Sequence, residues 1–128
     1  MSYYFAKTLE VPFDVAVQRV TEALAAKGFG VLTTIDVAAT LKKKLGVEFR
    51  PYMILGACNP QFAHRALQSE DKIGTMLPCN VIVQEHRPGQ VEVAAVDPEA
   101  SMSAVENDAL APIAGEVRGM LEQVVSDL

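Results

Sequence analysis

The sequence predicts an α+β fold, with a mostly antiparallel sheet of about five strands and helices covering one face. Strand-like segments alternate with segments of helical spacing in the order β-α-β-α-β-α-β-β-α. The last segment carries a wide apolar stripe, which predicts a long C-terminal helix. Half of the 128 residues are hydrophobic, which is enough for one buried core. We therefore expect a single domain over residues 1–128.

The first half of the chain predicts two strands, each followed by a helix. Residues 3–11 alternate loosely, as a strand does, and residues 29–35 are rich in β-branched side chains. The helix between them, residues 12–28, has apolar residues at steps of three and four: Phe13, Val17, Val20 and Leu24. A shorter helix follows from the cap residue Asp36 to Gly46. Its apolar face holds Val37, Leu41 and Leu45, and its exposed side holds Lys42, Lys43 and Lys44.

The second half predicts three more strands and two more helices. Residues 50–57 form the third strand, after which Asn59 and Pro60 suit the cap and first residue of a short helix. Residues 80–86 and 91–96 form the last two strands. They are joined by a type II turn over Arg87-Pro88-Gly89-Gln90. The stripe of the final helix holds Leu110, Ile113, Ala114, Val117, Met120, Leu121, Val124, Val125 and Leu128.

Composition and charge exclude several classes of function. A net charge of −5 argues against nucleic acid as a partner, because phosphate binding needs a cationic surface. No apolar run approaches the roughly 20 residues that cross a bilayer, so no membrane partner is expected. The N-terminus lacks the pattern of a secretion signal, and two cysteines make no disulfide framework, so we expect a cytoplasmic protein. The common nucleotide-binding and hydrolase motifs are missing as well.

Both cysteines lie where a strand pattern meets a turn, and each is followed by asparagine. Cys58 and Asn59 end the third strand in "LGACNPQFAHRAL", and Cys79 and Asn80 open the fourth in "LPCN". If these two strands pair antiparallel, the end of one lies beside the start of the other. Cys58 and Cys79 would then approach each other, with Asn59 and Asn80 holding the two turns.

Two further residues are candidates to complete a polar site. His64 lies about one helical turn into the short helix that follows Cys58, and two thiols with an imidazole suit zinc or copper. If the last two strands pair, Asp97 returns to the Cys79 end and is the best carboxylate to join His64. The candidate site therefore holds Cys58, Asn59, His64, Cys79, Asn80 and Asp97. Its candidate metal ligands are Cys58, His64 and Cys79.

The residues leave three functions open. A thiolate at Cys58, with Cys79 as partner in ligation or in a transient disulfide, predicts a ligand- or metal-binding or a thiol redox-responsive domain. Alternatively, the cysteines are small buried hydrophobes, and the chain is a homodimeric interaction module that hides one bare sheet face. The third is an enzyme with Cys58 as nucleophile, for which the sequence offers no recognisable oxyanion hole or general base.

Three stretches resemble a known family. "GFGVLTTIDVAATLKKKLGVEFRPYMILGACNPQFAHRAL", "IGTMLPCNVIV" and "VAAVDPEA" closely resemble the bacterial and archaeal family called domain of unknown function 302. The resemblance covers nearly the whole chain and rests on the motifs G-A-C-N-P, L-P-C-N and D-P. It implies a TATA-binding-protein-like fold, a curved sheet packed against a long C-terminal helix and often seen as a dimer. The family has no assigned biochemistry, so the resemblance implies a fold and no activity.

Overall fold

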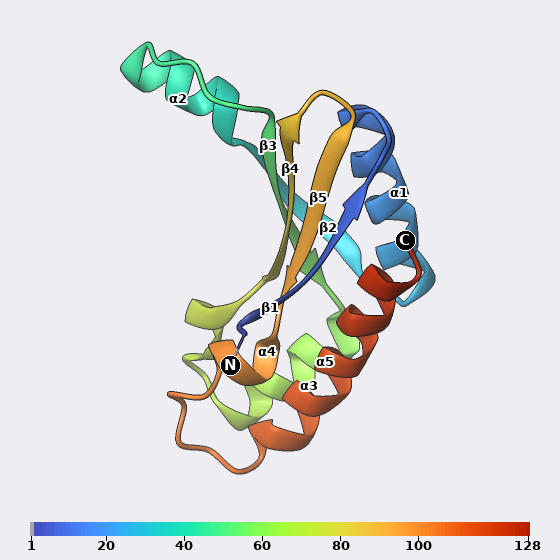
Figure 1. Ribbon diagram of the computed structural model, residues 1–128. Coiled ribbons are helices and arrows are strands. Elements are labelled where there is room, and N and C mark those ends of the chain that lie inside the picture. Colours follow the sequence, from blue (N-terminus) through green and yellow to red (C-terminus); the bar gives the residue numbers. More distant parts are fainter. Residues whose placement is uncertain (1) are drawn as a thin grey trace.

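The strands form one antiparallel sheet in the order β1-β5-β4-β3-β2, as Figure 1 shows. The computed structural model describes residues 2–128. The strands are β1 Tyr4–Leu9, β2 Gly30–Asp36, β3 Tyr52–Cys58, β4 Cys79–Arg87 and β5 Gln90–Val96. Every neighbouring pair is antiparallel, which confirms the expected pairing of β3 with β4 and of β4 with β5. The first strand pairs with the last and forms one edge of the sheet.

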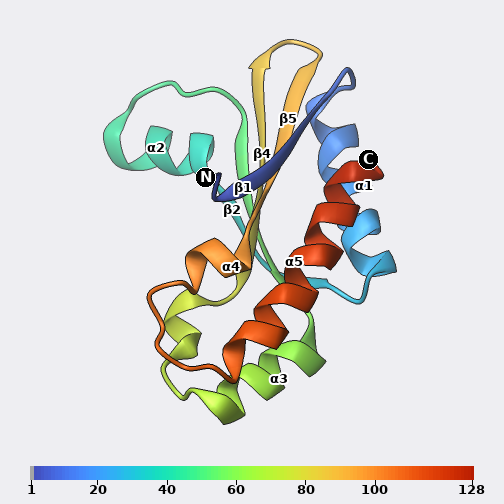
Figure 2. The same ribbon diagram turned by 60° about the horizontal axis from the view of Figure 1, so that its bottom comes forward.

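Two long helices cover one face of this sheet. They are α1 Phe13–Ala26 and α5 Leu110–Ser126, and α3 Pro60–Ser69 packs against α5 beyond the end of β3 (Figures 1 and 2). Two short elements were not predicted: the 3₁₀ helix η1 Ile73–Met76 and the helix α4 Pro98–Ser101. Asp97 begins α4 by accepting a hydrogen bond from the Glu99 N–H at 3.0 Å. Within residues 2–128, no helix is both long and apolar enough to cross a membrane.

The core lies between the sheet and these helices. Strand residues alternate between the two faces, so one set of side chains points to α1 and α5. This set includes Val81, Val83, Val91 and Val93, all fully buried. The predicted helical stripes meet it, with Val20 and Leu24 from α1 and Leu121 and Val124 from α5. The two sequence periods therefore place the core as expected.

The helix α2 Val37–Leu45 stands apart from the others. Its predicted ends are confirmed, because the Asp36 carboxylate accepts the Ala39 N–H at 2.9 Å and Gly46 adopts a left-handed φ of 68°. Its apolar stripe, however, has no buried residue, and Leu45 is 69% exposed. Figures 1 and 2 show α2 on the side of the sheet away from α1 and α5. We call the sheet face on that side the open face.

Gly56 in β3 should not accept a side chain. A Cβ there would collide with Thr33 Oγ1 and lie 2.8 Å from Pro78 Cγ, so the strand and the segment entering β4 would have to separate. We expect Gly56→Ala to lower the free energy of unfolding by about 1–3 kcal/mol, measured by urea denaturation. The control is Gly119→Ala on α5, where a Cβ meets nothing within 4 Å. It should be neutral or stabilising, and equal losses for both variants would contradict the close packing at Gly56.

Candidate functional site

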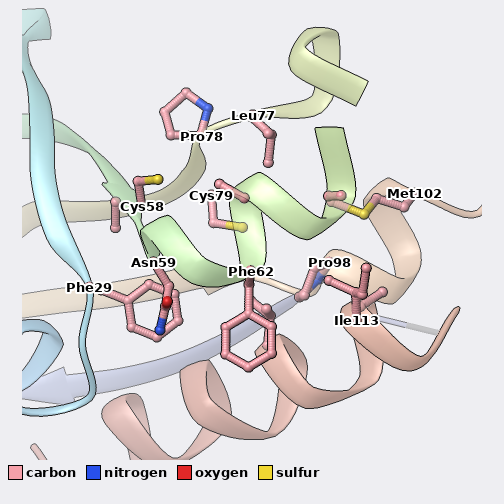
Figure 3. Close-up of a pocket in the computed structure, with 15 residues that line it drawn as sticks. Phe29, Cys58, Asn59, Phe62, Leu77, Pro78, Cys79, Pro98, Met102 and Ile113 are labelled. Atoms are coloured by element: carbon pink, nitrogen blue, oxygen red, sulfur yellow. The ribbon is translucent and has the colours of Figure 1, made fainter. Parts of the chain in front are cut away.

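A small apolar cavity lies where β3 ends and β4 begins (Figure 3). Its walls come from β3, β4, α3, α5 and the start of α4, and include Phe29, Phe62, Leu77, Pro98, Met102 and Ile113. The polar side chains on its lining are those of Cys58, Asn59 and Cys79. The volume is about 40 Å³, while a single water needs roughly 10–15 Å³ measured in this way. The cavity therefore has room for a molecule of a few atoms.

The register between β3 and β4 brings Cys79 to this cavity, and Cys58 lines the cavity at the point where β3 ends. Ala57 pairs with Cys79 across the ladder, so Cys58 lies one residue beyond the paired position. This confirms the expected approach of the two segments. Cys58 is half-buried at the end of β3, Cys79 is only 8% exposed at the start of β4, and both thiols are free. One thiol is thus open to small solutes and the other is enclosed.

Enclosure changes the acidity of Cys79. Burial, and to a smaller extent a negative charge on Cys58, raise the pKa of the Cys79 thiol from 9.0 to about 11. Cys79 is therefore protonated at neutral pH. A protonated thiol is a poor nucleophile, so any first attack on a small electrophile has to come from Cys58.

The two asparagines lie in different surroundings. Asn59 is at the cap position of α3, yet its side chain makes no capping hydrogen bond. It lines the cavity and lies near Gly28, where an added Cβ would be 3.2 Å from Asn59 Nδ2. Asn80 follows Cys79 in β4 and therefore points to the other side of the sheet, where it is exposed. Of the two expected turn residues, only Asn59 belongs to the cavity.

The expected pairing of Asp97 with His64 is not formed. Asp97 is buried and accepts a hydrogen bond from Arg118 Nε of α5 at 3.1 Å, in addition to capping α4. His64 is exposed on α3 and is not part of the cavity lining. His64 stays outside the cavity because a different face of α3 is turned toward it. Phe62 and Ala66, one turn apart, point inward, and a residue two positions after Phe62 lies on another face of the helix.

The structure does not bring Cys58, His64 and Cys79 together as the expected set of metal ligands. Among residues 2–128, no group of three His, Cys, Asp or Glu side chains is placed to hold a metal ion. The cysteines lie on the inner side of α3, while His64 faces solvent. Three protein ligands are the usual minimum for zinc, and two thiols alone do not provide them.

The sequence pattern does not predict the apolar walls of the cavity as a site, although it does predict that their residues are buried. Phe62 and Ala66 have the four-residue spacing of a helix face. Ile113 and Val117 belong to the stripe of the C-terminal helix and contribute the wall opposite the strands. The spacing predicts that these residues are buried but gives no indication of which of them border an unfilled space.

Comparison with known proteins gives a family and a fold. The family described as domain of unknown function DUF302 matches the chain over residues 5–128. The fold is similar to the crystal structure of an uncharacterised conserved DUF302 protein from Bacillus stearothermophilus. The TM-score is 0.90 and the sequence identity 28%, with 98% of each chain covered. No curated protein matches the sequence. These findings confirm the expected resemblance and the α+β architecture.

The two thiols should differ strongly toward alkylation. A pKa of about 11 leaves roughly one Cys79 thiol in 10⁴ ionised at pH 7, and burial limits access further. We expect iodoacetamide at pH 7 to give one adduct, at Cys58, by intact mass and peptide mapping. A second adduct, at Cys79, should form as the pH rises toward 11 or in urea. The control, Cys58→Ser, should stay unlabelled at pH 7, and fast labelling of Cys79 there would contradict its enclosure.

Proposed function

The chain belongs to the family described as domain of unknown function DUF302, and we propose that it is a thiol redox-responsive domain in which Cys58 and Cys79 interconvert between two thiols and one disulfide. The observation that carries the proposal is that both cysteine residues line one small cavity, Cys58 from the end of β3 and Cys79 from the start of β4. The proposal fits the cytoplasmic location expected from the sequence, where reduced thiols are the resting state.

The size of the cavity favours hydrogen peroxide as the oxidant. A volume of about 40 Å³ accommodates a molecule of a few atoms but is far below the roughly 300–1,000 Å³ of sites for organic ligands. In the first step the Cys58 sulfur attacks the O–O bond, which gives a sulfenic acid and releases water. In the second step the Cys79 sulfur attacks the Cys58 sulfur, which forms the S–S bond and releases a second water. Two electrons pass from the thiols to one peroxide.

The difference between the two thiols supports this order of steps. Cys58 is half-buried, so it meets a solute first, while Cys79 is enclosed and protonated. A negative charge on Cys58 contributes to the raised pKa of Cys79. Conversion of Cys58 to a neutral sulfenic acid removes that contribution. Burial still holds the pKa of Cys79 high, so Cys79 acts second, on the electrophilic sulfur of the sulfenic acid at Cys58.

A second candidate function is the homodimeric interaction module, in which both cysteines only fill space. It is favoured by a different observation, the open face of the sheet. Ile54 and Ile82 are paired on that face and remain partly exposed, while the long helices α1 and α5 cover the opposite face. In that case Cys58→Ala and Cys79→Ala should both fold and leave the oligomeric state unchanged.

Oxidation of the reduced protein by dilute hydrogen peroxide tests the redox proposal. We expect a disulfide within one chain, seen as the loss of both free thiols and of two hydrogen atoms in mass, and reversed by dithiothreitol. Cys79→Ser should stop at a sulfenic acid that dimedone traps, because the second sulfur is missing. Cys58→Ser should keep its remaining thiol.

Two results would contradict the redox proposal. One is a wild-type protein that keeps both free thiols after treatment with peroxide, while free cysteine added to the same sample is oxidised. The other is direct conversion of Cys58 to sulfinic and sulfonic acids at the same rate in wild type and Cys79→Ser, since that would mean that Cys79 does not reach Cys58.

A further inference from the structure

We propose that a groove on the open face of the sheet binds a small organic amine with an aromatic body. We call it the tyrosine groove and define it by Tyr3, Tyr4, Tyr52, Ile82, Glu92 and Ala94. Among residues 2–128, it shares no lining residue with the cavity that holds the two cysteines. The inference therefore goes beyond both functions proposed above and is independent of the chemistry of the thiols.

The strand register creates the groove. Directly paired residues on neighbouring antiparallel strands point to the same face of a sheet. Three successive rows of the open face border the groove: Tyr52, Gln84 and Glu92 in the first, Ile82 and Ala94 in the second, Tyr4 and Val96 in the third. The middle row is low at Ala94, because its side chain is only a methyl group, and larger side chains stand on either side. The volume is about 390 Å³, within the roughly 300–1,000 Å³ of sites for organic ligands.

One end of the groove is aromatic. All three tyrosines of the chain line the groove, and the chain contains no tryptophan. Tyr3 and Tyr4 pack edge to face, with ring centroids 5.0 Å apart and an interplanar angle of 75°, and both remain exposed. Such a pair offers a ring face and a ring edge to an incoming aromatic group. This end of the groove therefore fits the ring of a ligand.

The other end carries a carboxylate with one uncommitted oxygen. Within residues 2–128, Glu92 is the only acidic or basic residue of the lining. Its side-chain interactions use the same atom, since Oε1 accepts a hydrogen bond from Gln84 Nε2 at 2.9 Å and lies 3.5 Å from His86 Nε2. Oε2 has no hydrogen-bond or ion-pair partner in the described part of the chain. One carboxylate oxygen therefore stays available for an ammonium group.

Neighbouring side chains hold this carboxylate in place and leave no cation for an anionic ligand. Gln84 is buried, and its Oε1 accepts a hydrogen bond from Arg50 Nε at 2.9 Å. The Arg50 Cζ lies 4.4 Å from the Phe49 ring centroid and 5.7 Å from that of Tyr52, and Arg50 is outside the groove lining. Arg50 is thus engaged beside the groove, while Glu92 would repel an anion within it.

The separation of the two ends sets the shape of the ligand. Glu92 and Val96, which pairs with Tyr4, are four residues apart on β5, or about 13 Å at roughly 3.3 Å per residue. A ligand that reaches both ends has its ammonium group at Glu92 and its ring at the tyrosine pair. The chain between them lies over Ile82 and Ala94, which offer only apolar surface. These features together describe an arylalkylamine.

Titration of the full chain with 4-phenylbutylamine, followed by NMR of ¹³C-labelled tyrosine rings, tests the proposal. Because all three tyrosines line the groove, every tyrosine signal reports on this site. We expect the signals to shift with a dissociation constant of roughly 1 mM, as is usual for a ligand of this size. 4-Phenylbutanol, which lacks the charge, should bind roughly tenfold more weakly. 4-Phenylbutanoate, with the opposite charge, should bind more weakly still.

Two variants assign the binding to the groove. Glu92→Gln keeps the shape and removes the charge, so the amine should bind as weakly as the alcohol. The matched control Glu116→Gln, at an exposed position of α5, should bind the amine as wild type does. Ala94→Leu fills the floor of the groove and should weaken the binding of amine and alcohol alike.

Three results would overturn the proposal. The first is unchanged binding of the amine to Glu92→Gln, and the second is equal binding of 4-phenylbutylamine and 4-phenylbutanoate to wild type. The third is a set of tyrosine signals that do not move with the amine in large excess. None of these results bears on the oxidation of Cys58 and Cys79, so the redox proposal is tested separately.

Discussion

The pairing of β3 with β4 is the constraint on which the rest of the structure depends. Its register places Leu55 opposite Val81 toward the helices and Ile54 opposite Ile82 toward the open face. A shift by one residue would exchange the two faces, because side chains alternate along a strand. The same register brings the segments that carry Cys58 and Cys79 together. The core, the cavity and the open face are therefore three results of one alignment of two strands.

Local patterns in the sequence were sufficient for the five strands and the four longer helices, and for the pairing of β3 with β4 and of β4 with β5. Asp36 and Gly46 lie where the α2 helix begins and ends, because capping depends on residues within one turn. Strand neighbours followed from short connections, as at Gly89, whose φ of +81° is the value that a type II turn requires. The site was harder to predict. Asp97 is held by Arg118, 21 residues away on α5, and no local pattern reports such a contact.

Two failures of prediction have one physical origin. The spacing of Val37, Leu41 and Leu45 indicates which side of a helix avoids water, yet it does not indicate what covers that side. In the same way, the position of His64 about one turn into α3 gives no information on which face of α3 meets the sheet. That face is set by Phe62 and Ala66, which pack inward. The spacing of apolar residues predicts which face of a helix or strand avoids water. The residues that pack against this face are determined by the tertiary structure.

The irregular pairing of β2 at the edge of the sheet affects how easily another strand can add to that edge. Its pairing with β3 shifts register between Val31 and Thr33, and the chain leaves the strand for α2 directly after Asp36. An irregular edge of this kind is a poor template for a further strand, because the free N–H and C=O groups no longer form an even row. The sheet is therefore protected on this side against growth into open-ended aggregates, even though Leu32 and Ile35 are exposed there. The irregular edge therefore disfavours direct strand-to-strand pairing of two copies through β2, the pairing that would bring the exposed Leu32 and Ile35 of successive copies together.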